Sequence, residues 1–379
     1  MSDPLLYYVA LSILKNGFLR RVYPLIGDYS AEDIFYFLKP DFNTGISGVV
    51  SAYYKGDILT AADKIITRCR KENYSIIPVT DERYPHLLKE IYDPPPVIYT
   101  KGISEIRSPV AVVGTRNSDP QSSGFTRSVA KELSAAGCEI ISGMAKGIDR
   151  NAHAGCLEAG GVTVGVLANG IDSRYPADNY DIYNSITGSE KSFLVSEYPP
   201  GVNADRWTFV RRNRIISGMS YVTVIVKASA KSGALITAKY AVDQNREVFV
   251  CPGNVFDGGY AGCNDLLRQG ASVFTSADNL LESINLIAGK LRKKPAASGK
   301  AAPEKNNVSD KAWPETAVYD PASIEFKIMN SVRNKIQSID EIARALQVEA
   351  GVLNRKLIEM ELDGNLVFEG SRIIPAGVK

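Results

Sequence analysis

The sequence predicts an α/β fold in which a doubly wound parallel sheet is covered by helices on both faces. Three observations between residues 108 and 285 support this prediction. Short runs rich in β-branched residues recur, segments with helical periodicity separate most of them, and the runs are apolar throughout. Continuous apolar strands connected by helices are typical of parallel sheets that are buried on both sides. The predicted strands are PVAVVG, EIISG, VTVGVLANG, SFLVSEY, YVTVIVKAS, REVFVCPG and ASVFT.

The region before this domain is predicted to be helical and to end in an extended connector. Apolar residues recur at helical spacing in PLLYYVALSILK and in DILTAADKIITRCRKENY. The later segment YPHLLKEIYDPPPVIYTKG contains three consecutive prolines, which break helices and favour extended backbone. We therefore expect a helical domain with its connector over 1–104 and the α/β domain over 105–288.

The C-terminal part is predicted to be a flexible linker followed by a small module. Residues 289–320 are rich in Lys, Ala, Pro and small polar residues and show no periodicity. In 321–379, Ser338 and Glu341 form a capping-box pattern, a second helical segment follows, and LVFEGSRIIP predicts a hairpin turning at Gly370–Ser371. This order is that of a winged helix. Residues 322–379 contain eight basic and eight acidic side chains, so we expect this module to contact protein, or DNA only weakly.

Composition restricts the chemistry that the chain can perform. The formal net charge is +2, so any basic binding surface must be local. The five cysteines show no C-x-x-C spacing, and His86 and His153 are the two histidines, which argues against a disulfide framework and a metal site. We find neither a signal segment nor an apolar run near the ~18–20 residues of a membrane span. A soluble, cytoplasmic protein is expected.

Two nucleotide-binding fingerprints are absent from the sequence. In GTRNSD, Arg116 stands where the dinucleotide fingerprint requires its second glycine, and AKSGALIT lacks the Walker spacing. We therefore expect no cofactor.

Three loops that leave predicted strands and enter helices carry small residues, hydroxyls and a cation each. Ligands of open α/β sheets bind at such loops, and helix N-termini there favour anions. We expect the backbone N–H groups of Gly143 and Ser232 to help bind the anion. The candidate residues are Gly114 and Arg116 in the first loop, Ser142, Gly143, Lys146 and Gly147 in the second, and Lys231, Ser232 and Gly233 in the third.

The segment FVRRNRIISG, residues 209–218, concentrates positive charge in a nearly neutral chain. Only Asp205 is acidic nearby in sequence, so the arginines are poorly neutralised within the segment, and we expect them to bind phosphates. Trp207 and Phe209 are interleaved with them and could stack unpaired bases. The candidates here are Arg206, Phe209, Arg211, Arg212, Asn213 and Arg214.

Asp149 and His153 lie four residues apart and would share a helix face, so with Ser142 as nucleophile they could form a catalytic relay. We favour the alternative in which the pair has a structural role. Glu197 is likewise expected to form an ion pair with an arginine instead of acting as a base.

The chain resembles the DprA/Smf family of DNA-processing proteins over nearly its whole length. The resemblance rests on VAVVGTRN, SGMAKGIDRNAHAGCLEAGG, NGIDSRYPADN, LVSEYPPG, RRNRIISG, KSGALITAKYA and VFVCPGN, in this order. It implies a helical domain similar to the sterile alpha motif, an extended Rossmann domain and a winged helix. It also implies binding of single-stranded DNA, a homodimer formed through the Rossmann domain, and loading of the RecA recombinase during natural transformation, without enzymatic activity.

A nucleotide-processing enzyme of the nucleoside-monophosphate phosphoribohydrolase type, on a related Rossmann scaffold, is the alternative. Those enzymes carry a PGGxGT loop followed by a glutamate, whereas KSGALITAKYA has neither. The sequence therefore favours a non-enzymatic single-strand binder in which Arg116, Lys146, Arg212 and Arg214 hold successive phosphates.

Overall fold

The computed structural model describes residues 3–14, 30–38, 54 and 56–283, together with part of the C-terminal region. The chain divides into two compact units, 1–296 and 297–379. In the second unit the structure describes residues 366–369 and 372–375 and six single helical positions: 328, 331, 342, 346, 353 and 357.

A nine-stranded sheet forms the centre of the first unit, with the strand order β1-β2-β6-β5-β4-β3-β7-β8-β9. The strands from β3 to β9 are parallel, and all seven predicted strands are confirmed. Their bounds are β3 (Pro109–Val113), β4 (Glu139–Ser142), β5 (Thr163–Leu167), β6 (Phe193–Ser196), β7 (Val222–Ile225), β8 (Glu247–Val250) and β9 (Ser272–Val273).

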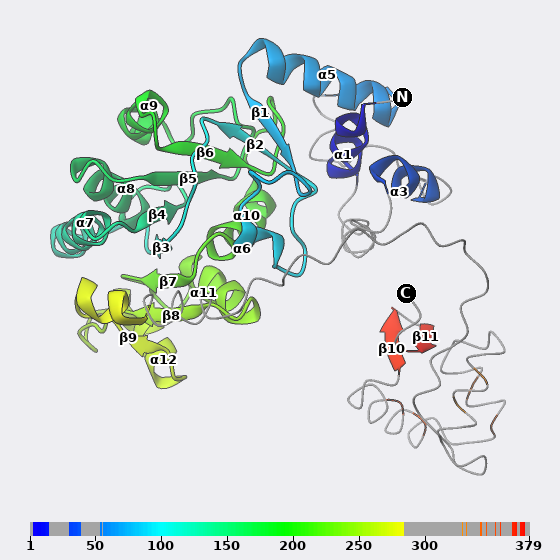
Figure 1. Cartoon of the computed structure of the whole chain (residues 1–379). Helices are drawn as coiled ribbons and strands as arrows, with labels where there is room; N and C mark the ends of the chain where they lie inside the picture. Colours follow the sequence, from blue (N-terminus) through cyan, green and yellow to red (C-terminus); the bar gives the residue numbers. More distant parts are fainter. Residues whose placement is uncertain are drawn as a thin grey trace, which may run out of the picture. The chain divides into compact units, whose positions relative to one another are not determined.

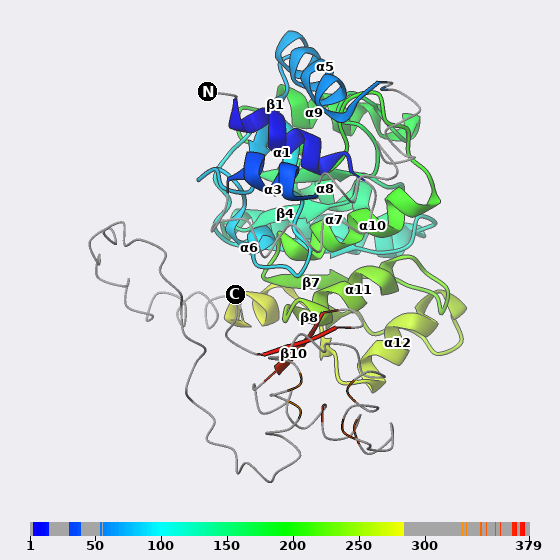
Figure 2. The ribbon, with the colours of Figure 1, turned by 90° about the vertical axis from the view of Figure 1, so that its right-hand side faces the viewer.

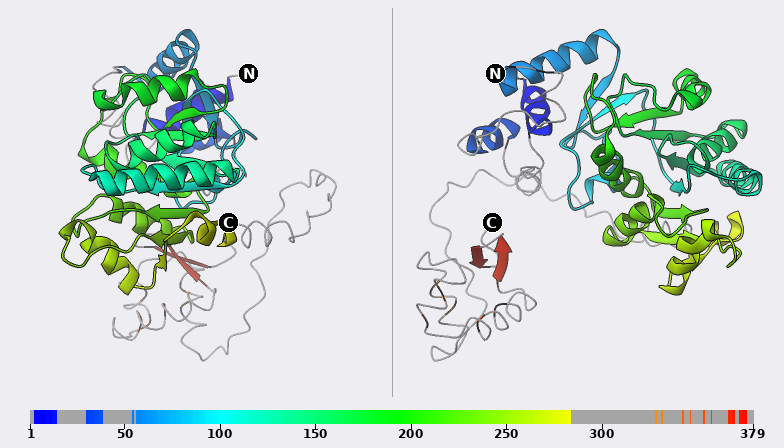
Figure 3. Two further views of the ribbon diagram at one scale, coloured as in Figure 1. Left: turned by 90° about the vertical axis from the view of Figure 1, so that its left-hand side faces the viewer. Right: turned by 180° about the vertical axis from the view of Figure 1, so that it is seen from behind.

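Helices cover both faces of this sheet, as a doubly wound fold requires. α7 (Pro120–Ala135), α8 (Ile148–Glu158) and α9 (Tyr180–Gly188) lie on one face, and α10 (Arg206–Gly218) and α11 (Ala234–Asp243) on the other (Figure 1). α12 (Ala261–Arg268) packs near β8. The left view of Figure 3 shows α7 and α8, coloured cyan to green, side by side across their face.

The central strands are apolar throughout because both of their faces are buried. In β3, Val110 and Val112 belong to one hydrophobic cluster, and Ala111 and Val113 belong to the other. All four side chains are at most 3% exposed. An apolar run in which polar residues do not alternate therefore indicates a strand that is buried on both faces. Such burial is typical of parallel sheets, so the run predicts a parallel strand.

The strand order reverses between β3 and β7. From β3 the chain proceeds through β4 and β5 to β6, whereas β7, β8 and β9 follow on the opposite side of β3. The loops that leave β3 and β7 therefore diverge at their carboxyl ends. Such a switch point is where open α/β sheets bind ligands.

Helices precede the sheet, as predicted. The described ones are α1 (Pro4–Ser12), α3 (Ala31–Leu38) and α5 (Ile58–Lys71), which lie together in Figure 2. Asp3 and Asp57 cap α1 and α5 by accepting hydrogen bonds from Leu5 N–H (3.0 Å) and Thr60 N–H (2.9 Å).

The prediction of an extended connector is confirmed only in part, because the segment also contains a short helix and its extended part joins the sheet. The segment contains the short helix α6 (His86–Lys89) and the strand β2 (Val97–Lys101), and β1 (Ser75–Pro78) precedes it. β1 pairs antiparallel with β2, and β2 pairs antiparallel with β6, so both strands extend the sheet. The three prolines at 94–96 lie between α6 and β2, outside any helix.

The second unit contains the predicted hairpin. β10 (Leu366–Glu369) pairs antiparallel with β11 (Arg372–Pro375), with Glu369 opposite Arg372. Ile328, Ile342, Leu353 and Leu357 are helical and buried. The linker 289–320 and most of the predicted winged helix lie outside the described residues, so the winged helix stays a prediction.

Among the described helices, none has the length and apolarity to cross a membrane. Within the same residues, no group of three or more metal-ligating side chains is assembled.

Candidate anion-binding cleft at the switch point

A cleft of about 370 Å³ lies at the carboxyl ends of β3 and β7. We call it the switch-point cleft. The loop after β3, the loop after β7 and the face of α10 form most of its wall. Predicted residues that line it are Gly114, Arg116, Phe209, Arg212, Asn213, Ser232 and Gly233, and residues that sequence reasoning did not assign to it include Thr115, Asp149, Ser229 and Thr237.

A smaller hollow of about 60 Å³, which we call the side pocket, adjoins the cleft. Arg116, Phe209 and Arg212 line both hollows, so they form the partition between them. The predicted residues Gly143 and Lys146 line the side pocket, and so does Tyr175, which was not predicted as a site residue.

Helix α10 presents two faces of different character. Asp205 begins it with a capping box, in which its carboxylate accepts from Thr208 N–H (2.8 Å) and Thr208 in turn contacts the Asp205 backbone. Phe209, Arg212, Asn213 and Ile216 follow helical spacing and line the cleft. Trp207 falls on a different face and is 77% exposed, so only Phe209 of the two aromatic candidates reaches the cleft.

Arg212 is a buried cation whose partners are uncharged. Its side chain is 4% exposed, and its Nη1 donates to the carbonyl oxygens of Val166 (2.7 Å) and Gly143. In the described part of the chain, no carboxylate lies within ion-pair distance of this guanidinium. Burial lowers the pKa of Arg212 to about 10, although the nearby Asp149 carboxylate acts in the opposite direction; Arg116 contributes to the lowering. The partition therefore holds a positive charge that an anion would stabilise.

Arg116 and Phe209 stand next to this buried charge. Arg116 is exposed, and its Cζ lies 4.7 Å from the centre of the Phe209 ring, within cation–π distance. Arg212 Cζ lies 6.0 Å from the same ring. The wall of the cleft thus combines two guanidinium groups with one aromatic face.

The expectation that Asp205 is the only acidic neighbour of these arginines is wrong for Arg211 and Arg214. Arg214 is 1% exposed, and its Nη2 forms an ion pair with Glu197 Oε1. Arg211 binds the same carboxylate through Nε (3.1 Å) and Nη2 (3.2 Å), and Arg214 Nε lies 3.4 Å from Asp93 Oδ2. The prediction that Glu197 pairs with an arginine is confirmed. These two arginines stabilise the fold and are not placed to bind a ligand in the cleft.

Several other predicted residues lie away from both hollows. Ser142 is buried and donates to the Val112 carbonyl oxygen (2.6 Å), while Gly147, Arg206 and Lys231 are not among the lining residues. Lys146 lines the side pocket but is paired with Asp178 at 2.7 Å. The Ser232 N–H group, which was expected to assist anion binding, donates to Ser229 O (3.0 Å).

Two glycines allow the loops to approach closely enough to build these hollows. Gly147 has φ +76°, and a Cβ there would lie 2.4 Å from the Thr115 carbonyl oxygen. A Cβ at Gly143 would lie 2.7 Å from the Arg212 guanidinium. Both predicted glycines therefore allow the loops of the site to pack closely against each other and against Arg212, because neither position has room for a Cβ.

The catalytic relay of Ser142, His153 and Asp149 is not assembled. His153 Nδ1 lies 2.7 Å from Thr163 Oγ1, whose hydroxyl donates to Ile140 O, so Nδ1 carries the proton. Burial lowers the pKa of His153 to about 3, which keeps the ring neutral. Asp149 instead accepts from Ala145 N–H (3.3 Å), and burial raises the pKa of its carboxyl. Both side chains bond to other groups of the protein, which favours the structural role that we expected for the pair.

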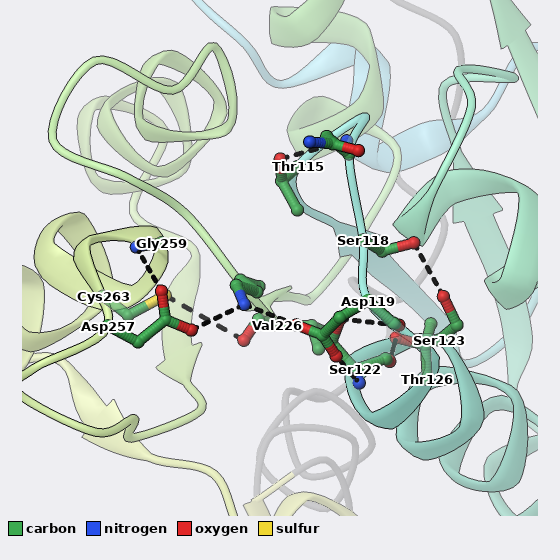
Figure 4. Close-up of polar contacts among 12 residues, drawn as sticks. Thr115, Ser118, Asp119, Ser122, Ser123, Thr126, Val226, Asp257, Gly259 and Cys263 are labelled. Carbon is green, nitrogen blue, oxygen red and sulfur yellow. Dashed lines mark hydrogen bonds and ion pairs between the residues drawn. The ribbon is translucent and has the colours of Figure 1, made fainter.

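Lys227 joins three loops around the switch point through Asp119 and Asp257, and Figure 4 shows these two carboxylates on separate loops. Its Nζ lies 2.5 Å from Asp119 Oδ2 and 2.8 Å from Asp257 Oδ2, and 4.6 Å from the centre of the Tyr260 ring. Its carbonyl oxygen accepts from Thr115 N–H (2.7 Å), beside Arg116. Asp119 also caps α7. Lys227 therefore positions the loop that carries Arg116, and its charge is already balanced by two carboxylates.

Replacing Lys227 by Met should lower the free energy of unfolding by about 1–3 kcal/mol, because two carboxylates lose their charged hydrogen-bond donor. Urea denaturation measures this change. Asp257→Asn, which keeps a side chain of the same shape and leaves Asp119 in place, is the control and should cost less. An unchanged midpoint for Lys227→Met would show that the ion pairs do not hold the loops.

The fold and the site define a doubly wound, Rossmann-like α/β protein with a cationic, partly aromatic cleft at its topological switch point. Comparison with known proteins identifies the family more closely. The family model described as DNA recombination-mediator protein A matches residues 75–285. The chain belongs to this family, as the motifs indicated.

Individual relatives agree with this assignment. DNA processing protein DprA of Bacillus subtilis is 38% identical over 224 residues, which cover 58% of this chain and 75% of that protein. Protein Smf of Escherichia coli is 31% identical over 299 residues, which cover 77% of this chain and 75% of that protein.

Two solved structures are also similar. The X-ray structure of DprA from Streptococcus pneumoniae has a TM-score of 0.58 and 27% identity, covering 74% of this chain and 98% of that one. A structure of DprA from Helicobacter pylori, described for its single-stranded DNA binding mode, has a TM-score of 0.51 and 28% identity. That match covers 57% of this chain and 96% of that one.

Proposed function

We propose that this chain binds single-stranded DNA in the switch-point cleft, without sequence preference and without catalysing a reaction. The observation that carries the proposal is Arg212, a buried guanidinium in the wall of the cleft that carbonyl oxygens hold without a carboxylate. A phosphate beside Arg116 adds negative charge next to two guanidinium groups that share one carboxylate neighbour, Asp149. Phe209, 4.7 Å from Arg116, stacks a base.

Other features support a single strand as the ligand. The Helicobacter pylori relative is described by its binding of single-stranded DNA. Bases that are unpaired expose their faces to aromatic side chains, whereas bases in a duplex are stacked on one another. Of the residues predicted from sequence, those that line the two hollows are proposed as DNA contacts: Gly114, Arg116, Gly143, Lys146, Phe209, Arg212, Asn213, Ser232 and Gly233.

The proposal is tested by fluorescence anisotropy with a labelled oligo-dT and a matched duplex at two salt concentrations. We expect tighter binding of the single strand and an affinity that falls steeply with salt, because bound phosphates release counterions. Equal affinity for the duplex, or binding that is insensitive to salt, would contradict the proposal.

A nucleotide-processing enzyme is a second candidate, and one observation favours it. Asp149 is a carboxylate that lines the cleft, and its raised pKa suits an acid group. Incubation with AMP separates the two functions. The DNA-binding proposal expects no free adenine, whereas release of adenine that Asp149→Asn abolishes would establish the enzyme.

We also propose that the chain acts in the cytoplasm as a homodimer that loads RecA onto the bound strand. Val255 and Phe256, which follow β8, and Val273 in β9 are 79%, 93% and 53% exposed, and these apolar side chains are proposed to contact a second copy. A dimer would let one strand occupy two clefts and gain from effective concentration. The C-terminal module, with balanced charge, is proposed to contact protein. Sedimentation of the wild type and of Phe256→Ser tests the dimer.

A further inference from the structure

Tyr175 is an exposed aromatic residue beside the partition between the two hollows. Its ring centre lies 5.9 Å from that of Phe209, with an angle of 56° between the planes. It lines the side pocket and is 49% exposed, so part of the ring is open to a ligand. Phe209 thus has a cation, Arg116, and a second aromatic ring as neighbours.

The backbone that carries Tyr175 is held firmly. Its N–H donates to Tyr183 Oη (3.3 Å), and the Tyr183 hydroxyl donates to the Tyr175 carbonyl oxygen (3.1 Å). Tyr183 is 2% exposed, and the preceding turn is held by Asn169, whose Nδ2 donates to Ser173 O (2.8 Å). An exposed ring on a fixed backbone loses little conformational freedom when a ligand stacks on it.

The side pocket suits the edge of a longer ligand more than a separate small molecule. At about 60 Å³ it is far smaller than the cleft, and it shares the Arg116, Phe209 and Arg212 wall with it. A ligand held in the cleft can therefore continue across Phe209 onto Tyr175. Two neighbouring aromatic rings, with guanidinium groups beside one of them, match a chain of bases joined by phosphates.

We propose that Tyr175 stacks a second base, next to the nucleotide held in the switch-point cleft, so that one DNA strand crosses the partition between the hollows. This inference rests on the proposed single-strand binding and names one further contact for it. Arg116 then lies between the two stacked bases, where it contacts the connecting phosphate.

The test compares Tyr175→Ala, Tyr175→Phe and the control Tyr180→Ala by anisotropy with labelled oligo-dT over a series of salt concentrations. Tyr180 is a suitable control because it is 47% exposed, close in sequence, and lines neither hollow. We expect Tyr175→Ala to weaken binding about tenfold, with Tyr175→Phe and Tyr180→Ala within about twofold of the wild type. The salt dependence of Tyr175→Ala should equal that of the wild type, since no phosphate contact is lost.

A fluorescent 2-aminopurine placed within the oligonucleotide reports stacking directly. Wild type and Tyr175→Phe should quench it, and Tyr175→Ala should quench it less. Wild-type affinity for Tyr175→Ala, or equal losses for Tyr175→Phe and Tyr175→Ala, would overturn the inference while leaving single-strand binding intact. Failure of the wild type to bind oligo-dT would reject both proposals together.

Discussion

Replacing Arg116 and Phe209 together by alanine is expected to weaken binding of oligo-dT about a hundredfold, roughly 2.7 kcal/mol. Both side chains line the cleft and the side pocket, and Arg116 Cζ lies 4.7 Å from the centre of the Phe209 ring. The variant loses one phosphate contact and one stacked base, each of which typically contributes about 1–3 kcal/mol. Anisotropy titrations at several salt concentrations measure both effects, and the salt dependence should become shallower because one phosphate contact is lost.

Arg206→Ala is the matched control for this variant. It removes an exposed arginine from the first residue of the same helix, away from both hollows. Its affinity should remain within about twofold of the wild type. If the two variants lose affinity equally, general positive charge and not the cleft would account for binding.

Replacing Glu197 by Gln should destabilise the protein by about 3–5 kcal/mol, because Arg211 and Arg214 would lose their shared counter-charge. Arg214 is 1% exposed and Glu197 is 7% exposed, so water cannot take over the role of the carboxylate. Guanidinium denaturation of the two proteins measures the difference. Glu190→Gln, at an exposed position before β6, should leave the midpoint unchanged. An equal midpoint for Glu197→Gln would show that the buried ion pairs contribute nothing to stability.

The same ion pairs predict how stability depends on pH. Burial alone favours the neutral acid, but Arg214 and Arg211 outweigh it and hold the pKa of Glu197 below its ordinary value of 4.5. A carboxyl whose pKa is lower in the folded state contributes its stability above the unfolded pKa and loses it as the pH falls through the folded one. The contribution of Glu197 is therefore complete at neutral pH and is lost only in acid.

The structure changes which arginines should be tested for DNA binding. On the sequence, Arg212 and Arg214 are the natural targets, because they lie at the centre of the charged run. In the fold, Arg214 is held by Glu197 and Asp93, and Arg212 supports the loop at Gly143. Loss of binding in variants of either residue would not separate a lost phosphate contact from a disturbed fold. Arg116 avoids this ambiguity because it is exposed.

Sequence reasoning found the loops that form the site. It did not find the residues from other segments that contact these loops or pair with the arginines. Gly114, Arg116, Ser232 and Gly233 follow strands whose carboxyl ends meet at one edge, so their convergence could be predicted. Tyr175 could have been found from the same rule, since it follows β5 within the motif NGIDSRYPADN. Asp93 could not, because it precedes Arg214 by more than a hundred residues and meets it only in the fold.

The sequence by itself determined the elements and their class. Apolar runs of β-branched residues specify the strands from β3 to β9, and Asp residues before α1, α5, α7 and α10 specify where those helices begin. These signals are local, because they depend on a residue's own backbone preference and on the periodicity of its neighbours. The motifs that indicated the family lie in the same strands, helices and connecting loops.

Only the tertiary structure decided which charges are available to a ligand. Arg211, Arg212 and Arg214 are close in sequence, yet Arg212 lines the cleft whereas the other two contact Glu197 on a different face of α10. Likewise, β2 joins the sheet by pairing with β6, almost a hundred residues later, and β1 joins it by pairing with β2. The physical reason is the same in both cases. Ion pairing and strand pairing depend on distances between segments that come together only when the core is formed.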